Sequence, residues 1–517
     1  MVSRKSQPIC YTSILIGVAV ACAVTKGDGD GKEREVAPDN CLIWGPGLTP
    51  RIALPVRYFY IQAVDQFNQN FTESVGSQAF KFGINLSDGS RLRSVRVDVI
   101  DRRDGSYIAR FRLLKASVEN VIITVMYDGR QVAASPYKLM GPIYDEHCDC
   151  PQPNLQEWFS TMMCPATYKQ LQQDLSIFQD PLDFDKVAKE AVERFYGTFS
   201  HYKIIANKIY RKDFFGTRHI TGVSFIDEIL LSLARKVKLP DVEFIMNLSD
   251  WPKEKKDIKD GPIPIVSFCG SDDSRDIVLP TYEMVKSTIY MLERHNTDQF
   301  SVQGKTGPVW EEKTNLAFWR GRDSRQERLD LAVMAQKHPD VFNVSLSRMS
   351  FFPKDEKYGN ISKHVNFFDF FQHKYQITID GTVAAFRLPL LLASDSVVLK
   401  QDSTYYEHFY HALEPYVHYI PFKSDLSNLL EQIQWAKDHD EEAKAIGRRS
   451  QDFVLEHLTP SHLYCYHVKV LHELSKLLKN KPKLEEGFAL VTSKDPISKT
   501  CDCKEFDKAQ EQSHTEL

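Results

Sequence analysis

The sequence predicts an all-β sandwich followed by a larger α/β region in two halves. Short β-branched runs separated by Asp-Gly turns fill residues 36–145, which is typical of a sandwich of antiparallel sheets. From residue 155 to about 480, strands alternate with amphipathic helices, which is typical of parallel sheets. A chain of 517 residues also exceeds the size at which one hydrophobic core usually stops growing, so several domains are expected.

Composition narrows the classes of partner. The chain is 42% hydrophobic and 26% charged, which is typical of soluble folded proteins. A formal net charge of -4 gives no basic field along the whole chain. Nucleic acid and anionic membrane surfaces are therefore not expected as main partners, and any anion site must be local.

Residues 1–23 are typical of a secretory signal peptide. A basic start precedes an apolar run over residues 14–24, and Ala21 and Ala23 provide a small-x-small cleavage site. The alternative is a membrane anchor, but this run is short for a span. No later stretch reaches about 18 uninterrupted apolar residues, so the sequence predicts a lumenal chain with no membrane span.

The β-rich segment 36–145 contains the strand-like runs RYFYIQAVD, AFKFGINL, SVRVDVID, SYIARFRLL and VIITVMYDG. Asp-Gly turns at residues 88, 104 and 128 lie between or after them. The stretches DRRDGSYIARF and ITVMYDGRQVAASPYKL resemble a filamin-type immunoglobulin-like repeat. That resemblance implies a domain that binds or spaces rather than catalyses, and its own sheets predict independent folding.

Cysteines and glycosylation sequons agree with a lumenal compartment. Removing the signal segment leaves eight cysteines, an even number suited to disulfides, although their pairing is not readable from the sequence. The pairs Cys148-x-Cys150 and Cys501-x-Cys503 are alternatively zinc ligands, but their spacing is not the usual two-residue gap, so disulfides are favoured. Asparagines followed at the second position by Ser or Thr are Asn70, Asn85, Asn247, Asn343 and Asn360.

The α/β region divides into two series of strands and helices. The first contains a helix over 184–196, strands over 241–248 and 263–268, and a helix that follows them. The second contains five strands, and a helix is expected to start at Thr382 between the third and the fourth. Residues 425–479 are expected to be helical and to cover one half or cross back between the two. The strands of the second series are expected over 315–321, 341–347, 375–380, 396–400 and 416–422.

Ligands of open parallel sheets bind beyond the C-terminal ends of the strands, so polar residues there are candidates for a site. Asp380 ends one strand, Gly381 turns, and the first-turn amides of the expected helix favour an anion. Arg387 would reinforce that site, although an arginine that extends to solvent is the alternative. Pro389 is expected to bend the helix.

A second candidate segment carries four arginines around one glycine. Guanidinium groups make bidentate contacts with phosphate oxygens, so this cluster suits a diphosphate. A solvated helix start, with Glu327 pairing locally, is the alternative. The arginines are Arg320, Arg322, Arg325 and Arg328.

A third candidate is Asp250, which follows the strand over 241–248. A carboxylate in that position can accept a proton from a hydroxyl group. The alternative is a turn aspartate that caps the loop before Pro252. Asp272 and Asp273, after the next strand, are the next candidates for a base.

A metal-bound diphosphate is not expected. Asp-x-Asp pairs start at Asp28, Asp183 and Asp438, and none of them follows a strand at the expected site. Arginines would then take over the role of a cation.

The last segment, residues 481–517, is expected to be a tail that carries a targeting signal. Its end resembles the lumenal retrieval signals that finish in Glu-Leu, and such a signal is recognised by a receptor. The sequence thus predicts residence in the lumen of the endoplasmic reticulum. The four signal residues are His514, Thr515, Glu516 and Leu517.

Five motifs in order carry a more specific resemblance. The stretches YRKDFFGTRHITGV, LPDVEFIMNLSDWP, FWRGRDSRQER, DGTVAAFRLPLLLASDSVVLKQ and YYEHFYHALEPYVHYIPF resemble the protein O-glucosyltransferases related to Rumi. The resemblance covers about residues 160–475. With the filamin-type repeat and the retrieval signal, the chain is most similar to the KDEL motif-containing members of that family.

This resemblance implies an α/β GT-B glycosyltransferase with two Rossmann-like halves. It implies inverting transfer of glucose from UDP-glucose to serine of folded EGF-like repeats, as in Notch and fibrillin-type proteins, without a metal or other cofactor. Asp250 would be the general base. The contacts of the UDP-sugar would be Trp310, Arg320, Arg328, Thr382, Val383, Ala384, Ala385, Phe386 and Arg387. The acceptor would lie along Phe215, Gly216, Thr217, Arg218 and His219.

Departures from the family pattern leave the acceptor and the sugar donor open. Phe214 and Ile220 occupy the places of two cysteines that bracket the acceptor loop in Notch-directed relatives, and Arg322 replaces a small polar residue. UDP-xylose as the donor remains an alternative. The alternative from another functional class is a lumenal binding or chaperone protein that has lost catalysis. The presence of Asp250, Arg328 and Arg387 argues against this alternative.

Overall fold

The computed structural model describes residues 33–114, 117–216, 220–258, 261–293, 296–363, 365–493, 501 and 503. The predicted signal peptide and the retrieval residues 514–517 lie outside the described residues. Within the described part of the chain, no helix combines the length and the apolar character that crossing a bilayer requires.

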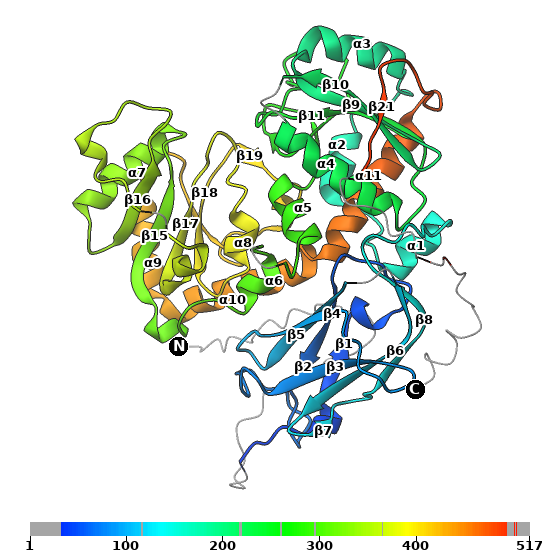
Figure 1. Ribbon diagram of the computed structural model, residues 1–517. Coiled ribbons are helices and arrows are strands. Elements are labelled where there is room, and N and C mark those ends of the chain that lie inside the picture. Colours follow the sequence, from blue (N-terminus) through cyan, green and yellow to red (C-terminus); the bar gives the residue numbers. More distant parts are fainter. Residues whose placement is uncertain are drawn as a thin grey trace, which may run out of the picture.

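The N-terminal sandwich consists of two antiparallel sheets, as the sequence predicts (Figure 1). Buried side chains from both sheets, including Phe59, Phe80 and Ile123, form one core between them. Asp128 and Gly129 have φ values of 44° and 76°, so this Asp-Gly pair makes the tight two-residue turn between β6 and β7. The first sheet has the order β1 (Leu42–Trp44), β2 (Arg57–Gln62), β5 (Ser106–Leu113), β4 (Val95–Asp101). In the second sheet, β6 (Ser117–Tyr127) pairs with β3 (Phe80–Leu86), β7 (Arg130–Gln131) and β8 (Tyr137–Tyr144).

The first half of the α/β region is built on a mixed sheet rather than a fully parallel one. Strands β11, β12 and β14 are parallel, but β9 and β10 form an antiparallel hairpin. Ala206 and Asn207 have φ values of 50° and 63°, which suit the tight hairpin turn. The order is β14 (Ile277–Val278), β12 (Ile265–Ser267), β11 (Val242–Asn247), β9 (Thr198–Ile205), β10 (Lys208–Phe215), β21 (Ala489–Leu490).

The second half is built on a fully parallel five-stranded sheet, as expected. All six residues of the strand over 373–378 are buried, which is typical of a strand covered on both faces. The order is β16 (Phe342–Arg348), β15 (Thr314–Arg322), β17 (His373–Thr378), β18 (Val397–Gln401), β20 (Ile420–Phe422). A short antiparallel pair, β13 (Gly270–Ser271) with β19 (Tyr405–Tyr406), connects the two halves.

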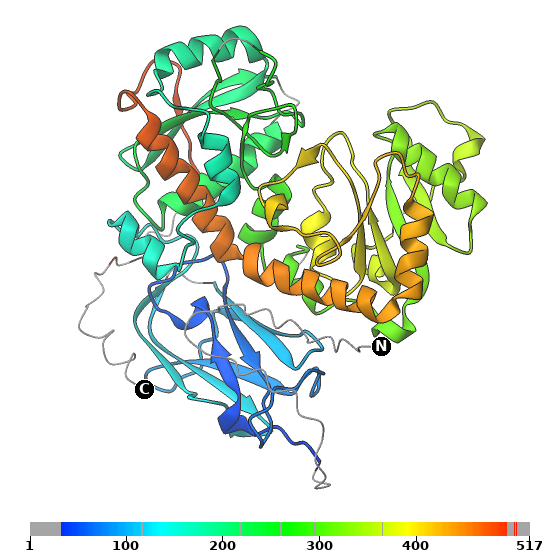
Figure 2. The same cartoon turned by 180° about the vertical axis from the view of Figure 1, so that it is seen from behind.

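Helices cover both sheets, and the last two cross between them. The chain leaves α9 for α10, which packs on β18 of the second half, and then enters α11, which packs on β11 of the first half (Figure 2). Residues 425–479 were expected either to cover one half or to cross between the two halves, and the structure shows that they cross. The helices are α1 (Leu155–Thr161), α2 (Lys169–Leu175), α3 (Phe184–Phe195), α4 (Ile220–Ala234), α5 (Tyr282–Ile289), α6 (Gln299–Gln303), α7 (Gln326–Lys337), α8 (Leu388–Leu392), α9 (Leu429–Asp438), α10 (Asp440–His457) and α11 (Pro460–Leu477).

The helix expected from Thr382 starts later and is shorter than predicted. Residues 381–387 form bends and a turn, and α8 begins at Leu388 and spans five residues. Pro389 lies in its first turn, where the missing N–H needs no partner, so it does not bend the helix. The prediction of anion binding by first-turn amides after Gly381 is therefore wrong.

The filamin-type sandwich shares a core with the α/β region. Tyr58, Ile100 and Ile108 belong to the large apolar cluster that also includes residues of α4, α5 and α11. Ion pairs cross the same surface, with Arg110 bonded to Asp298 at 2.8 Å. The expectation of a repeat that folds on its own is revised, because one face of its first sheet is a buried interface.

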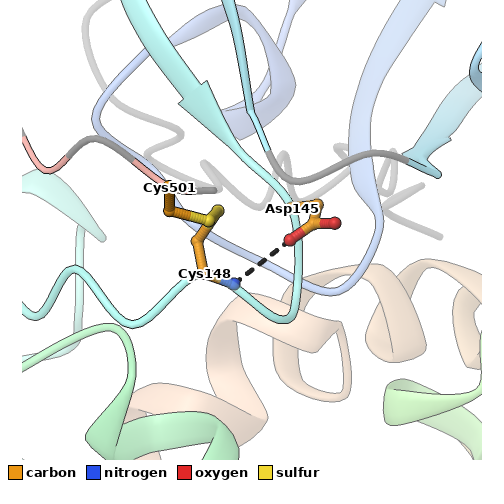
Figure 3. Close-up of side chains that lie close together, drawn as sticks. All are labelled: Asp145, Cys148 and Cys501. Carbon is orange, nitrogen blue, oxygen red and sulfur yellow. Dashed lines mark hydrogen bonds between the residues drawn. A yellow bond between two sulfur atoms is a disulfide. The ribbon is translucent and has the colours of Figure 1, made fainter. Parts of the chain in front are cut away.

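Disulfides hold the chain together at the junction of the domains. Cys148 bonds to Cys501 and Cys150 to Cys503, which confirms the preference for disulfides over zinc, and Cys164 bonds to Cys465. Asp145 lies next to the first of these bonds and accepts the backbone N–H of Cys148 (Figure 3). The sulfurs of Cys148 and Cys501 are bonded to one another and are not thiolate ligands. Cys41 and Cys269 are free and buried.

Candidate active site

The strand order of the second half contains a switch point between β15 and β17. The chain goes from β15 to β16 on one side and then to β17 on the other side of β15. The loops that follow these two strands therefore run in opposite directions, which is where open α/β sheets bind ligands. Both arginine segments predicted from the sequence lie at the C-terminal ends of these two strands or in the residues that directly follow them.

Arg328, in the first turn of α7, ties the two loops together. Its Nε donates to the carbonyl of Asp380 at 2.6 Å, and its Nη atoms donate to the carbonyls of Arg322 and Ile379 at 3.1 and 3.0 Å. Burial, together with the nearby charge of Arg387, lowers its pKa to about 9. Arg328 thus orders the switch point, while a direct contact with a diphosphate stays a prediction.

Arg387 lies beside Arg328 and is partly buried. One Nη donates to the carbonyl of Arg320 at 2.6 Å. Burial lowers the pKa of Arg387, and the carboxylate of Glu283 opposes that shift. Among the described residues, no carboxylate forms an ion pair with either Arg328 or Arg387, and only one Nη of Arg387 forms a hydrogen bond, to the carbonyl of Arg320.

The other arginines of the cluster do not converge. The guanidinium of Arg320 donates to the side chain and the carbonyl of Asn343 at 2.6 and 2.7 Å, so it lies along β16. Arg325 pairs with Glu327 at 3.0 Å. Arg322 is exposed and lies over the ring of Phe351. The predicted cradle of four arginines is corrected, because Arg320 contributes its carbonyl rather than its guanidinium.

Trp310 lies at the opposite end of the sheet. It precedes β15, is 4% exposed, and donates its indole N–H to Asp440 at 3.0 Å. The nine residues of β15 separate it from the switch point by roughly 30 Å, at about 3.3 Å per residue. The prediction that Trp310 contacts the sugar nucleotide is therefore wrong.

The segment after Gly381 lines the switch point with its backbone. The N–H of Gly381 donates to the carbonyl of Val383 at 2.8 Å, and the side chains of Val383 and Ala384 are buried. A Cβ at Gly381 would lie 3.0 Å from an Nη of Arg328, so glycine permits this close approach. Thr382, Ala385 and Phe386 are partly exposed and remain candidates for contact with a ligand.

Asp250 is exposed after the end of β11, and its carboxylate does not cap the turn. Asn247 performs that role, because its amide oxygen accepts the N–H of Ser249 at 3.0 Å and its amide nitrogen donates to the carbonyl of Trp251 at 2.8 Å. No hydrogen bond or ion pair of the Asp250 carboxylate occurs among the described residues. Its backbone is held by the thiol of Cys269, which donates to the Asp250 carbonyl at 3.5 Å. The free carboxylate can accept a proton.

Tyr282 connects the neighbourhood of Asp250 to that of Arg387. Burial raises its pKa to about 12, with further contributions from the charges of Glu283 and Asp250. Its ring contacts the ring of Phe386 edge to face, with centroids 5.7 Å apart. Asp250 of the first half and Arg387 of the second therefore flank one contact between the halves. No sequence pattern pointed to Tyr282, since a tyrosine at a helix start is ordinarily a packing residue.

The predicted acceptor segment lies only partly within the described residues. Phe215 ends β10 and Gly216 is exposed, while Thr217, Arg218 and His219 lie outside the described residues. Phe215 pairs with Thr198, whose carbonyl accepts the N–H of Leu248. The end of β10 and the loop of Asp250 thus leave the same edge of the first sheet.

Asp273 and one aspartate from each of two acidic pairs form ion pairs. Asp273 forms an ion pair with Lys255 at 2.9 Å, while Asp272 is exposed. Of the Asp-x-Asp pairs, Asp183 bonds to Lys479, and Asp440, the second aspartate of the pair that starts at Asp438, bonds to Lys374. The pair at Asp28 lies outside the described residues. Transfer without a metal stays a prediction.

The sequons differ in accessibility. Asn247 is fully buried and both its oxygen and its nitrogen are bonded, so the folded chain offers no free amide there. Asn343 is bonded to Arg320 and His373. The prediction of glycosylation at Asn247 is corrected on this ground, while Asn70 and Asn360 are exposed and Asn85 is partly exposed.

Comparison of families assigns the two parts of the chain. A model of glycosyl transferase family 90 matches residues 159–515, and a model of the filamin/ABP280 repeat matches residues 35–138. The first match covers more than half of the chain, including both sheets of the α/β region. The α/β region is therefore a glycosyltransferase.

Individual relatives narrow this class. Protein O-glucosyltransferase 2 of Danio rerio is 49% identical over 453 residues, which span 87% of this chain and 90% of that protein. Protein O-glucosyltransferase 3 of Homo sapiens is 42% identical over 498 residues, 95% of this chain and 97% of that protein. Protein O-glucosyltransferase 1 of Bos taurus is 30% identical over 65% of this chain and 86% of that protein. The chain belongs to the protein O-glucosyltransferase family, as its motifs predicted.

Two solved structures show weak likeness. The Lin-41 filamin domain covers 20% of this chain at 16% identity and a TM-score of 0.16. The GtfA/B complex covers 87% of this chain at 10% identity and a TM-score of 0.25. Neither TM-score reaches 0.5, and the family assignment depends on the sequence matches alone.

Proposed function

We propose that the chain transfers glucose from UDP-glucose to a serine of folded EGF-like repeats, with inversion, in a GT-B arrangement of its two halves. The observation that carries this proposal is the contact of Tyr282 with Phe386 between the halves, because the charge of Asp250 acts on Tyr282 and Arg387 directly follows Phe386. The names of the similar proteins support transfer of glucose to a protein acceptor.

Inversion by single displacement needs one base and a stabilised leaving group. Asp250 accepts the proton of the serine hydroxyl while the serine oxygen bonds to the anomeric carbon. The bond from that carbon to the β-phosphate oxygen breaks, and UDP leaves with its additional negative charge. Arg387 stabilises that charge, and Arg328 holds the two loops at the switch point in place.

The remaining parts of the proposal depend on sequence signals. The signal peptide, the retrieval residues 514–517 and the disulfides together favour the lumen of the endoplasmic reticulum, with a retrieval receptor as a partner. EGF-like repeats of Notch or fibrillin-type proteins are the acceptors implied by the family. No metal is required in this mechanism, since arginines stabilise the leaving diphosphate.

A turnover assay with defined donors tests the proposal. The purified full-length chain is incubated with a folded EGF-like repeat and either UDP-glucose or UDP-xylose, with and without EDTA, and the mass of the repeat is measured. We expect a hexose on serine of the folded repeat, no addition to the reduced repeat, and no loss with EDTA. Preferential addition of a pentose would instead assign UDP-xylose as donor. Binding of UDP or of the repeat without any transfer would indicate a binding protein that has lost catalysis.

A further inference from the structure

Phe351 is an exposed aromatic residue at the rim of the switch point. It follows the end of β16, and 56% of its surface is exposed, whereas its neighbour Phe352 packs against the core of the second half. Large exposed aromatic side chains mark binding surfaces when they are held in place, because their flat faces stack on planar ligands.

The loop that carries Phe351 is held by a buried carboxylate. Asp323 is fully buried and accepts the backbone N–H groups of Ser350, Phe351 and Phe352 at 2.8 to 2.9 Å. These hydrogen bonds favour the ionised carboxylate and lower the pKa of Asp323. Since Asp323 directly follows β15, the position of Phe351 is fixed relative to the switch point.

Arg322 completes a flat surface with this ring. Its guanidinium lies over Phe351 with the central carbon 5.2 Å from the ring centroid, and its side chain is exposed. Its carbonyl accepts a hydrogen bond from Arg328 at the switch point. The Arg322–Phe351 pair therefore lies directly beside Arg328 at the switch point.

We propose that the Arg322–Phe351 pair stacks the planar base of the nucleoside diphosphate donor. This inference depends on the proposed function, which places the diphosphate at Arg387. The direction of the donor follows from the strand order β16, β15, β17. The reacting sugar must lie on the β17 side, where Phe386 contacts Tyr282 near Asp250. The base at the other end of the diphosphate then extends to the β16 side, where Phe351 lies.

A second arginine-aromatic pair lies on the other side. Arg325 lies 5.8 Å from the ring centroid of Tyr405, in β19, which pairs with β13 of the first half. This pair therefore lies toward the sugar and Asp250, and it does not compete for the base.

Binding measurements on Phe351→Ala, Phe351→Trp and Ile361→Ala test the inference. Ile361 is a matched control, because it is 45% exposed in the same connection between β16 and β17. Calorimetric titration of the full-length chain with UDP and with inorganic pyrophosphate separates base contacts from phosphate contacts. We expect Phe351→Ala to weaken UDP binding roughly tenfold, as for loss of one base–aromatic stack. Phe351→Trp and Ile361→Ala should bind UDP as the wild type does, and pyrophosphate affinity should not change in any variant.

Three results would overturn the inference. Wild-type UDP affinity in Phe351→Ala, together with a raised KM for the acceptor repeat, would assign the surface to the acceptor. Equal losses for UDP and pyrophosphate would mean that the substitution disturbs the anion site. Absence of any nucleotide binding by the wild type would remove this inference and the proposed function together.

Discussion

At the scale of single residues, a substitution of Arg387 should separate an effect on ligand affinity from an effect on protein stability. Its guanidinium is anchored on the carbonyl of Arg320 and has no carboxylate partner among the described residues. Arg387→Lys keeps the charge but loses the planar fork, so we expect UDP affinity to fall about tenfold or more, while the thermal midpoint changes little. Titration with UDP and thermal unfolding measure the two effects.

Arg348→Lys is the matched control, because Arg348 is exposed at the end of the neighbouring strand β16. It should leave UDP affinity unchanged. Wild-type UDP affinity in Arg387→Lys would exclude Arg387 from the diphosphate site.

The buried carboxyl group of Glu407 should make the free energy of unfolding depend on pH. It is fully buried after β19, and burial raises its pKa from 4.5 to about 8, while hydrogen bonds and the charge of Lys400 oppose that shift. The folded state therefore keeps a proton that the unfolded chain loses above pH 4.5. This contribution to stability is complete below that pH and is lost as the pH rises through about 8.

Glu407→Gln removes this titration. Each pH unit within the window costs the wild type about 1.4 kcal/mol through this group, so the variant should lose less unfolding free energy between pH 5 and pH 8. Denaturant unfolding at both pH values measures the difference. Glu431→Gln, at an exposed site on α9, serves as control. Equal losses in wild type and Glu407→Gln would show that Glu407 is ionised in the folded state.

Sequence patterns pointed to some residues of the candidate site and missed others. Asp250 and Arg387 were singled out because each follows a strand at the edge where ligands bind, and their roles stay predictions. Arg320 and Trp310 were assigned wrongly, because the face on which a side chain leaves a strand, and the end at which a residue lies, depend on the neighbouring strands. Tyr282 was missed because its role arises only from contact between the halves.

At the scale of elements, the short pair of β13 and β19 joins the two halves. Gly270 pairs with Tyr406, and a Cβ at Gly270 would overlap the Tyr406 ring. Gly270→Ala should therefore destabilise the protein by about 1–3 kcal/mol, as overpacking does, and should lower transfer activity because it separates the halves. Denaturant midpoints and turnover rates measure both effects.

Gly83→Ala is the control for Gly270→Ala, since no atom lies within 4 Å of an added Cβ there. It should change neither quantity appreciably. If Gly270→Ala has wild-type stability and activity, the β13–β19 pair does not set the spacing of the halves.

Element types were easier to predict than their pairing. The parallel strands of the second half were recognised from continuous apolar runs, and all of them occur. The hairpin of β9 and β10 was missed, because its turn at Ala206 and Asn207 has no glycine to signal positive φ values. The helix after Gly381 was placed too early, because the prediction counted apolar residues that instead pack as an irregular turn.

At the scale of the whole molecule, the filamin-type sandwich is part of the transferase. Arg110 of β5 is 5% exposed and pairs with Asp298, which is 1% exposed and caps α6. Arg110→Ala leaves that carboxylate buried without a cation, so we expect a loss of about 3–5 kcal/mol. Because the core is shared, the loss should shift one cooperative transition of the full-length chain in scanning calorimetry.

Arg130→Ala, at an exposed position in the far sheet of the same sandwich, is the control and should not shift the transition. Two transitions, with only one shifted by Arg110→Ala, would show that the sandwich unfolds separately. In that case the original expectation of an independent repeat would be restored.

Transfer by Asp250→Asn tests the mechanism most directly. The substitution keeps the shape of the side chain, creates no sequon because Pro252 stands at the second position after it, and removes the ability to accept the serine proton. Because Asn247 rather than Asp250 caps the turn, folding and UDP affinity should match the wild type. The rate of glucose transfer to a folded EGF-like repeat should fall about a hundredfold to ten-thousandfold. A rate within about threefold of the wild type would contradict the mechanism and move the search for the base to Asp272, which is exposed after the neighbouring strand β12.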